Sequence, residues 1–119
     1  MTINELFVIN NNRANRWHPG GIKEWSALEW AGAMCGEAGE AANAAKKLKR
    51  VESKLQNINA QGRSLIDVES AQIAVSNEVC DTILYGLLLM ARVGIVDPEI
   101  VLAEVFNRKS EEYGFPERM

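Results

Sequence analysis

The chain has 119 residues, of which 47% are apolar and 24% are charged, the profile of one ordinary globular domain. A net charge of −3 and a pI near 5.2 argue against a general nucleic-acid surface, which would be strongly basic. The longest apolar stretch, residues 83–91, is shorter than the roughly 18 residues of a membrane span, and residues 1–13 lack the pattern of a signal peptide. We therefore expect a single cytoplasmic domain over residues 1–119 that contacts neither nucleic acid nor membrane.

Two helices are predicted in the N-terminal half. Apolar residues at helical spacing predict a first helix over residues 3–16, which Pro19 and the two following glycines end. Ser26 and Glu29 have the spacing of a capping box, so a second helix begins near Ser26 and runs to about Arg50. Its residues that recur every three or four positions, and that we expect to face a core, are Trp30, Met34, Glu37, Ala41, Ala44 and Leu48.

Two further helices follow a polar segment, residues 51–65, which is interpreted as a loop or a frayed helix end. The third helix runs from about Asp67 to Arg92 and stops at Gly94. Asp97 as N-cap and a proline at the first helical position begin a fourth helix, which ends near Tyr113. Apolar residues cover a wide arc of the third helix, and its core-facing stripe is Ala74, Glu78, Asp81, Tyr85 and Leu88.

The predicted fold is all-α, a four-helix bundle whose second and third helices form a long antiparallel pair. Such a pair brings two groups of acidic residues opposite each other, because each group lies near the middle of its helix. Two cysteines lie beside these groups, Cys35 and Cys80, and we expect both to be reduced and buried in helix interiors.

The acidic residues form two pairs, Glu37 with Glu40 and Glu78 with Asp81. Both pairs have i,i+3 spacing, which places the two carboxylates of each pair on one face of a helix. A single pair of this kind is common on a solvated surface. Here both pairs interrupt apolar stripes, and no lysine or arginine lies three or four positions away to neutralise them. Two helices that share a divalent metal site explain the pattern better than two solvated faces do.

Carboxylates without histidine favour a cation that prefers oxygen, so Mg²⁺ is expected, with Mn²⁺ as a possible substitute. A di-iron centre would need a Glu-x-x-His motif on two helices, and the single histidine, His18, lies outside both acidic helices. Magnesium held by few carboxylates takes substrate phosphates as further ligands, which indicates phosphoryl or nucleotidyl chemistry. Lys46 and Lys47 could reach such phosphates, or they could simply be the cations that a helix C-terminus favours.

Three segments closely resemble the MazG-like all-α nucleoside triphosphate pyrophosphohydrolases, whose pattern is E-x-x-E on one helix and E-x-x-D on the next. The segments are GEAGEAANAAKKLKR (36–50), NEVCDTILYGLLL (77–89) and FNRKSEEYGFPER (106–118). The opening, with Asn12, Arg13 and Trp17 before Trp25, is similar as well, so the resemblance covers most of the chain. The stretch between the acidic pairs is longer than in compact members, which leaves specificity and oligomeric arrangement open.

The resemblance implies hydrolysis of a nucleoside or deoxynucleoside triphosphate to the monophosphate and pyrophosphate, in housecleaning or pool balancing. It implies Mg²⁺ held by Glu37, Glu40, Glu78 and Asp81, with Glu37 and Glu40 as catalytic residues, one of which orients the attacking water. It also implies a homodimer or a dimer of dimers. The substrate contacts that it implies are Trp17, Trp25, Lys46, Lys47, Tyr85, Asn107 and Lys109; the two tryptophans could instead pack in a core or lid.

Two alternatives remain open at the level of sequence. The same fold and chemistry could act on phosphoribosyl-ATP. A non-catalytic nucleotide-binding helical module would also explain the helices and the acidic pairs, if metal and nucleotide bind without turnover. Neither the base nor the sugar of the substrate follows from the residues.

Overall fold

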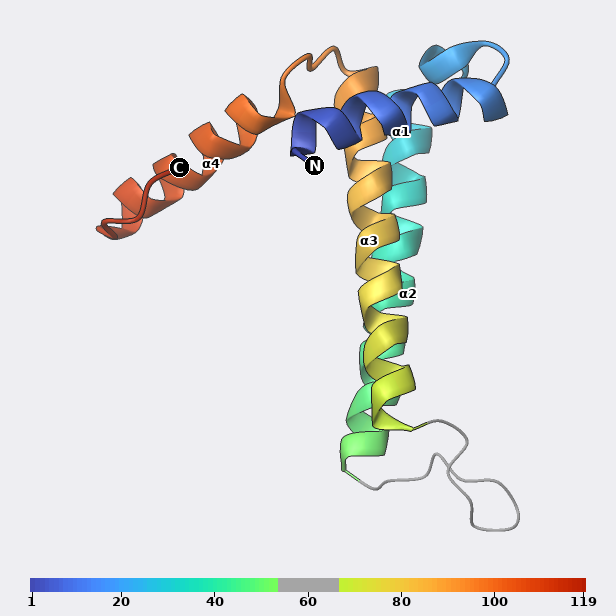
Figure 1. Cartoon of the computed structure of the whole chain (residues 1–119), viewed down its shortest axis with the longest axis vertical. Coiled ribbons are helices and arrows are strands. Elements are labelled where there is room, and N and C mark those ends of the chain that lie inside the picture. The colour runs from blue at the N-terminus through green and yellow to red at the C-terminus, as the bar shows by residue number, and fades with distance from the viewer. Residues whose placement is uncertain (54–66) are drawn as a thin grey trace. The chain divides into compact units, whose positions relative to one another are not determined.

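The computed structural model describes residues 1–53 and 67–119, and these residues form helices and no strand. The all-α class is therefore confirmed, and each α-helix agrees with its predicted range to within two residues. Of the predicted polar segment 51–65, Val51 and Glu52 complete a helix and Ser53 begins a turn, while 54–65 lie outside the described residues. The elements are α1 (Ile3–Trp17), the short 3-10 helix η1 (Gly21–Glu24), α2 (Ala27–Glu52), α3 (Val68–Arg92) and α4 (Pro98–Tyr113) (Figure 1).

The helix ends follow local chemistry. As predicted, Asp97 caps α4, since its carboxylate accepts the Ile100 N–H at 3.1 Å. Gly94 ends α3 with a φ of 91°, and the N–H of the next residue, Ile95, donates to the Met90 carbonyl five residues back at 3.0 Å. A capping box that the sequence analysis did not single out begins α1: Thr2 Oγ1 accepts the Glu5 N–H, and the Glu5 carboxylate accepts the Thr2 N–H.

The chain divides into two compact units. The first unit comprises Met1–Ala27 and Leu87–Met119, and the beginnings of α1 and α4 are joined within it by hydrogen bonds of Asn4. Asn4 Nδ2 donates to the Asp97 carboxylate at 2.9 Å, and the Asn4 backbone N–H donates to the Glu99 carboxylate at 3.1 Å. The buried residues of this unit include Phe7, Asn10, Ala14, Leu87, Leu88, Pro98 and Ser110.

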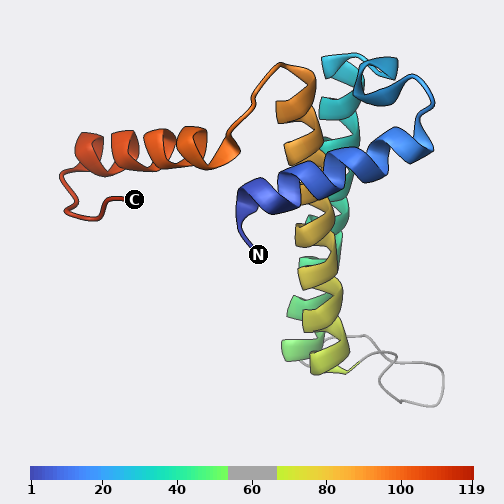
Figure 2. The ribbon, with the colours of Figure 1, turned by 45° about the horizontal axis from the view of Figure 1, so that its top comes forward.

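The second unit, Leu28–Gly86, is an antiparallel hairpin of α2 and α3. The two helices run side by side in both views of the ribbon (Figure 1, Figure 2), as the sequence analysis predicted. Trp30 on α2 is 1% exposed and its ring lies 6.2 Å from the ring of Tyr85 on α3. The predicted stripe of α2 is confirmed, because Trp30 is buried and its other five members are half-buried.

Expectations about burial are wrong for both cysteines and for Asp81, a member of the predicted core-facing stripe of α3 that is exposed. Cys35 and Cys80 are free thiols as expected, but both are exposed. The wide apolar arc of α3 is also largely uncovered, with Val79 44% and Ile83 51% exposed. The physical reason is that a two-helix hairpin covers one side of each helix, and these residues lie on other sides.

Among the described residues, α3 alone is long and apolar enough to cross a membrane by length and composition. One such helix is weak evidence for a span, because the core helix of a soluble protein passes the same test. The apolar window of α3 also contains Glu78 and Asp81, and charged side chains in the bilayer interior are costly. The absence of membrane contact therefore stays a prediction.

Candidate metal centre

Three of the four predicted ligands meet at the middle of the hairpin. Glu37 on α2 and Glu78 and Asp81 on α3 each offer a carboxylate oxygen, and these oxygens lie within 4.8 Å of one another. Mg²⁺ binds oxygen at about 2.0–2.1 Å, so small side-chain rotations would bring the three oxygens onto one ion. The donor set consists of oxygen alone, which fits a hard cation and not zinc or copper.

Glu40 lies beside this triplet rather than within it. Its carboxylate is not among the three oxygens that meet, but it is close enough to influence both Glu37 and Glu78. Glu40 and Asp81 are exposed, whereas Glu37 and Glu78 are half-buried. The i,i+3 spacing on α2 thus brings both glutamates near Glu78 of α3, and Glu40 is the more exposed of the two.

The carboxylates disturb one another's protonation. Partial desolvation raises the pKa of Glu37, and a hydrogen bond with Glu40 and the charges of Glu40, Asp81 and Glu78 raise it further. Partial desolvation is also the main reason that the pKa of Glu78 is raised, followed by Glu40 and Asp81. Among the described residues no lysine or arginine forms an ion pair with this cluster. The cluster therefore holds excess negative charge that a divalent cation would neutralise.

A groove continues from the carboxylates along the hairpin toward the C-terminus of α2. Its volume is about 370 Å³. Lys47, a predicted phosphate contact, lines it, whereas Lys46 is not among its lining residues; both lysines are exposed. The groove is lined by Glu40, Asn43, Ala44 and Lys47 from α2 and by Ala71, Ala74 and Glu78 from α3.

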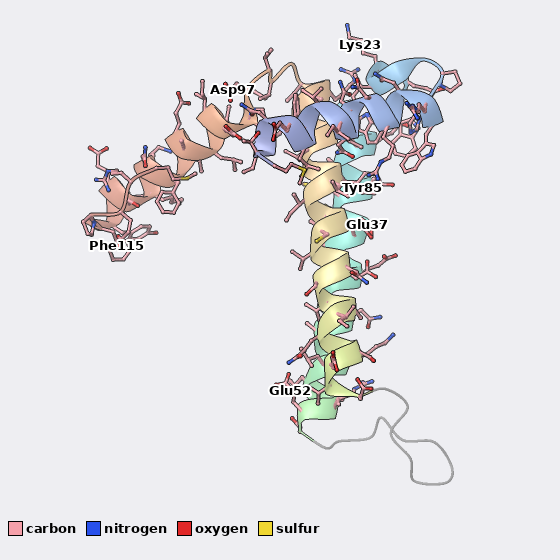
Figure 3. All side chains as sticks on the ribbon, viewed as in Figure 1. Lys23, Glu37, Glu52, Tyr85, Asp97 and Phe115 are labelled. Atoms are coloured by element: carbon pink, nitrogen blue, oxygen red, sulfur yellow. The ribbon has the colours of Figure 1, made fainter. Side chains whose placement is uncertain are left out.

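Tyr85 lies on the other side of the carboxylates. It follows Asp81 by one turn of α3, is half-buried and packs near Trp30. Figure 3 labels Tyr85 on α3 and Glu37 on α2 at neighbouring levels of the hairpin. Along the second unit the order is therefore an aromatic pair, the carboxylates and a groove that contains a lysine.

The two predicted tryptophan contacts belong to the first unit, and both have partners there. Trp17 is 67% exposed, and the Arg13 guanidinium lies 5.2 Å from its ring centroid. Trp25 is half-buried, packs edge-on against His18 with ring centroids 4.9 Å apart, and accepts a hydrogen bond from Arg92 at its carbonyl. These contacts account for both tryptophans without a substrate, so their proposed stacking on a base stays a prediction.

The two predicted contacts on α4 also have partners in the first unit. The Asn107 amide exchanges hydrogen bonds with the backbone of Met119. The Lys109 ammonium lies 3.8 Å from a Glu112 carboxylate oxygen and 5.9 Å from the ring centroid of Tyr113. The predicted contact of Asn107 and Lys109 with substrate therefore stays a prediction.

Asn43 also lines the groove, although it was not predicted as a site residue. The signal was present, since Asn43 lies three residues after Glu40 and four before Lys47, on one side of α2. Asn43 shares a side of α2 with Glu40 and Lys47, but it lies next to the predicted core-facing stripe and not within it, so the periodicity did not indicate it.

A scan against protein-family models, a search of curated proteins and a search of solved structures each found no match to this chain.

Proposed function

We propose that this chain is a Mg²⁺-dependent nucleoside triphosphate pyrophosphohydrolase of the MazG-like type. The observation that carries the proposal is the convergence of the Glu37, Glu78 and Asp81 oxygens within 4.8 Å on an antiparallel helix pair. The reaction adds water across the anhydride between the α and β phosphates and releases a nucleoside monophosphate and pyrophosphate.

In this proposal Glu37, Glu78 and Asp81 hold the metal, and Glu40 acts on water. Magnesium, when bound, neutralises phosphate charge and lowers the pKa of a coordinated water. Glu40 stands beside the triplet with an exposed carboxylate, so it can orient the attacking water and accept its proton. The Lys47 ammonium in the adjoining groove balances charge on the leaving phosphates.

Two further parts of the proposal concern assembly and location. The exposed apolar residues of α3 support self-association as a homodimer or dimer of dimers. The acidic net charge supports a protein that does not bind nucleic acid, and the location that we propose for it is the cytoplasm.

The test is a turnover assay with Mg²⁺ and a panel of ribo- and deoxyribonucleoside triphosphates. Pyrophosphate is measured through the orthophosphate that appears only when inorganic pyrophosphatase is added. We expect release from one or a few substrates by the wild-type protein and none by Glu40→Ala. Retained turnover in Glu40→Ala would contradict the role of Glu40.

Silence of the wild-type protein across the panel would count against the free-nucleotide substrate. Phosphoribosyl-ATP is then the next substrate to assay. Mg²⁺-dependent nucleotide binding without product from any of these substrates would overturn the enzymatic proposal in favour of a non-catalytic nucleotide-binding module.

A further inference from the structure

One side of α1 carries a row of exposed residues, which we call the α1 row. Its members are alternately four and three positions apart, a spacing that places them on one side of a helix. They are Glu5, Ile9, Asn12 and Arg16, and all four are exposed. Val8, beside the row, is 54% exposed, and Ile9 is 60% exposed. The row therefore has an acidic end and a basic end, with apolar side chains and an amide between them.

Two surface hollows lie along the α1 row and meet at Ile9. Each has a volume of about 360 Å³. The first is lined by Asn4, Glu5, Val8 and Ile9, and the second by Ile9, Asn12, Arg13 and Arg16. Hollows between the side chains of one helix are the grooves into which the side chains of a neighbouring helix pack. The row therefore has the shape of a surface on which a second helix can dock.

Both charged ends of the row can still bind a partner. Among the described residues, Arg16 forms no ion pair. Its neighbour Arg13 is already engaged, since its guanidinium donates to Asn10 Oδ1 at 3.2 Å and lies 5.2 Å from the Trp17 ring centroid. At the acidic end, Glu5 uses its Oε2 atom in the capping box of α1, so its Oε1 atom can accept from an arginine.

We propose that the α1 row binds the same row of a second copy of the chain, with the two α1 helices antiparallel. A parallel arrangement would set Glu5 against Glu5 and Arg16 against Arg16. The antiparallel arrangement sets Glu5 of each copy against Arg16 of the other, and the opposed helix dipoles favour it as well.

A twofold axis midway between Ile9 and Asn12 gives this contact. Glu5 and Arg16 lie equally far from the axis, about 8 Å along the helix at 1.5 Å per residue. Both ion pairs therefore form at once, as a contact between identical surfaces requires. Near the axis the Ile9 side chains of the two copies meet, so apolar surface is covered where the helices are closest.

The contact is small. One face of a helix of this length buries less than the roughly 1,200–2,000 Å² of a stable interface, so it is too weak to join two monomers. We therefore expect it to join dimers that the exposed side of α3 has already formed, where more than one weak contact acts at once. This inference rests on the proposed self-association of the chain, but it does not depend on nucleotide hydrolysis.

Sedimentation equilibrium of the full chain in low salt, over a range of concentrations, separates the two association steps. The wild-type protein should form dimers and, at higher concentration, dimers of dimers. Arg16→Glu and Glu5→Lys should each lower the association constant of the second step by about 10- to 50-fold, because every contact holds the ion pair twice and the variants replace attraction by repulsion. The matched control, Arg108→Glu on α4, makes the same change in charge and should assemble as the wild type does.

An equimolar mixture of Arg16→Glu and Glu5→Lys tests the antiparallel arrangement. Each variant alone sets like charges against each other, whereas a contact between one copy of each variant restores both attractive pairs. The mixture should therefore regain the second step. A mixture that stays at the dimer would overturn the arrangement, and so would equal losses in Arg16→Glu and Arg108→Glu.

The role of Glu5 in the capping box needs its own control. Glu5→Gln keeps an acceptor for the Thr2 N–H and removes only the charge, so it should weaken the second step by a smaller factor with unchanged circular dichroism. Wild-type assembly in a folded Glu5→Lys protein would count against the contact. A wild-type protein with no second step at any concentration would overturn the proposal and leave the α1 row to a different protein.

The proposals fail separately. Assembly that Ile83→Glu reduces to the monomer and Arg16→Glu leaves unchanged would support the contact on α3 and contradict the contact on α1. A second step that is lost in Arg16→Glu and regained in the mixture, in a protein that hydrolyses no nucleotide, would support the α1 contact and contradict the proposed reaction.

Discussion

Glu37, Glu78 and Asp81 bring three carboxylate oxygens within 4.8 Å of one another on a partly desolvated face. Like charges at this distance oppose folding unless protons or a cation offset them. The raised pKa values of Glu37 and Glu78 mean that these carboxylates bind protons more readily, which reduces the repulsion. A bound divalent ion would reduce it as well. At the scale of single residues, we therefore expect the protein's stability to depend both on pH and on the presence of a divalent cation.

Replacing Asp81 by Asn tests the metal assignment with little change in shape. We expect Mg²⁺ affinity to fall by roughly 10- to 100-fold or more, because that is the effect of losing even an outer-shell partner of a metal ligand. Calorimetric titration with Mg²⁺, or with Mn²⁺ as a paramagnetic substitute, measures the change. Glu69→Gln on the same helix is the control, since Glu69 belongs to the first turn and not to the cluster. Equal affinity in Asp81→Asn and Glu69→Gln would remove Asp81 from the site.

The pH dependence of stability has a defined sign. The pKa of Glu78 is raised above 4.5 in the folded protein. Between pH 4.5 and the raised pKa, the folded state therefore binds more protons at Glu78 than the unfolded state does. The free energy of unfolding contributed by Glu78 therefore falls as the pH increases from about 4.5 through the raised pKa. Without Mg²⁺, Glu78→Gln should have a higher Tm than the wild type at pH 7.5, and the difference should shrink toward pH 4.5. Thermal unfolding followed by circular dichroism would reveal a constant difference if this coupling were absent.

Magnesium should reverse this order at neutral pH. Metal binds the deprotonated carboxylates, so the rise in wild-type Tm on adding Mg²⁺ should be larger at pH 7.5 than at pH 5 and small in Glu78→Gln. Asp67 and Asp97, whose pKa values are lowered by helix-end hydrogen bonds, act with the opposite sign and are common to both proteins. The comparison between variant and wild type therefore isolates the cluster.

At the scale of elements, the α2–α3 hairpin depends on one large buried side chain. Trp30 is 1% exposed and packs near Tyr85 one turn beyond the carboxylates. Trp30→Ala should lower the free energy of unfolding by about 3–5 kcal/mol, the usual cost of removing a buried aromatic side chain. Trp30→Phe retains a ring and should cost less. Urea unfolding measures both, and similar values for the two variants would show that the ring does not anchor the hairpin.

The end of α3 offers a second prediction for an element. Gly94 has a φ of 91°, a conformation that costs most L-residues about 1–2 kcal/mol. Gly94→Ala should therefore lower the free energy of unfolding by about that amount, whereas Gly94→Asn should lower it less, because asparagine tolerates positive φ. An equal loss in both variants, measured by urea unfolding, would indicate that side-chain volume and not backbone conformation matters there.

For the whole molecule, we expect the uncovered apolar side of α3 to form a contact between copies of the chain. Val79 and Ile83 are one turn apart and are 44% and 51% exposed. Ile83→Glu would place a charge in a contact between copies of the chain, so we expect it to shift the protein to the monomer, while Ile83→Val leaves assembly unchanged. Size-exclusion chromatography with light scattering reports the molar mass. A wild-type monomer, or an assembly that tolerates Ile83→Glu, would place the interface elsewhere.

The sequence by itself determined the elements and the half-buried positions of Glu37 and Glu78, whereas the other member of each acidic pair, Glu40 and Asp81, is exposed. Helix ends depend on contacts between residues that are close in the sequence, such as Asp97 with the Ile100 N–H. Such contacts can be predicted from the sequence alone. The core-facing stripe through Trp30 and Glu37 follows from helical periodicity alone, and the structure confirms it. The capping box of Thr2 and Glu5 could also have been predicted from its spacing, although it was not.

Tertiary structure alone decided which of these residues meet. Periodicity places Glu37 and Glu40 on the same face, but the rotation and offset of α2 against α3 bring Glu37 into the triplet and leave Glu40 beside it. The same rotation puts Lys47, and not its neighbour Lys46, into the groove. These relations depend on packing between helices, to which large side chains such as Trp30 contribute. The periodicity of one helix predicts which of its faces is buried, but it does not predict where the partner helix lies along that face.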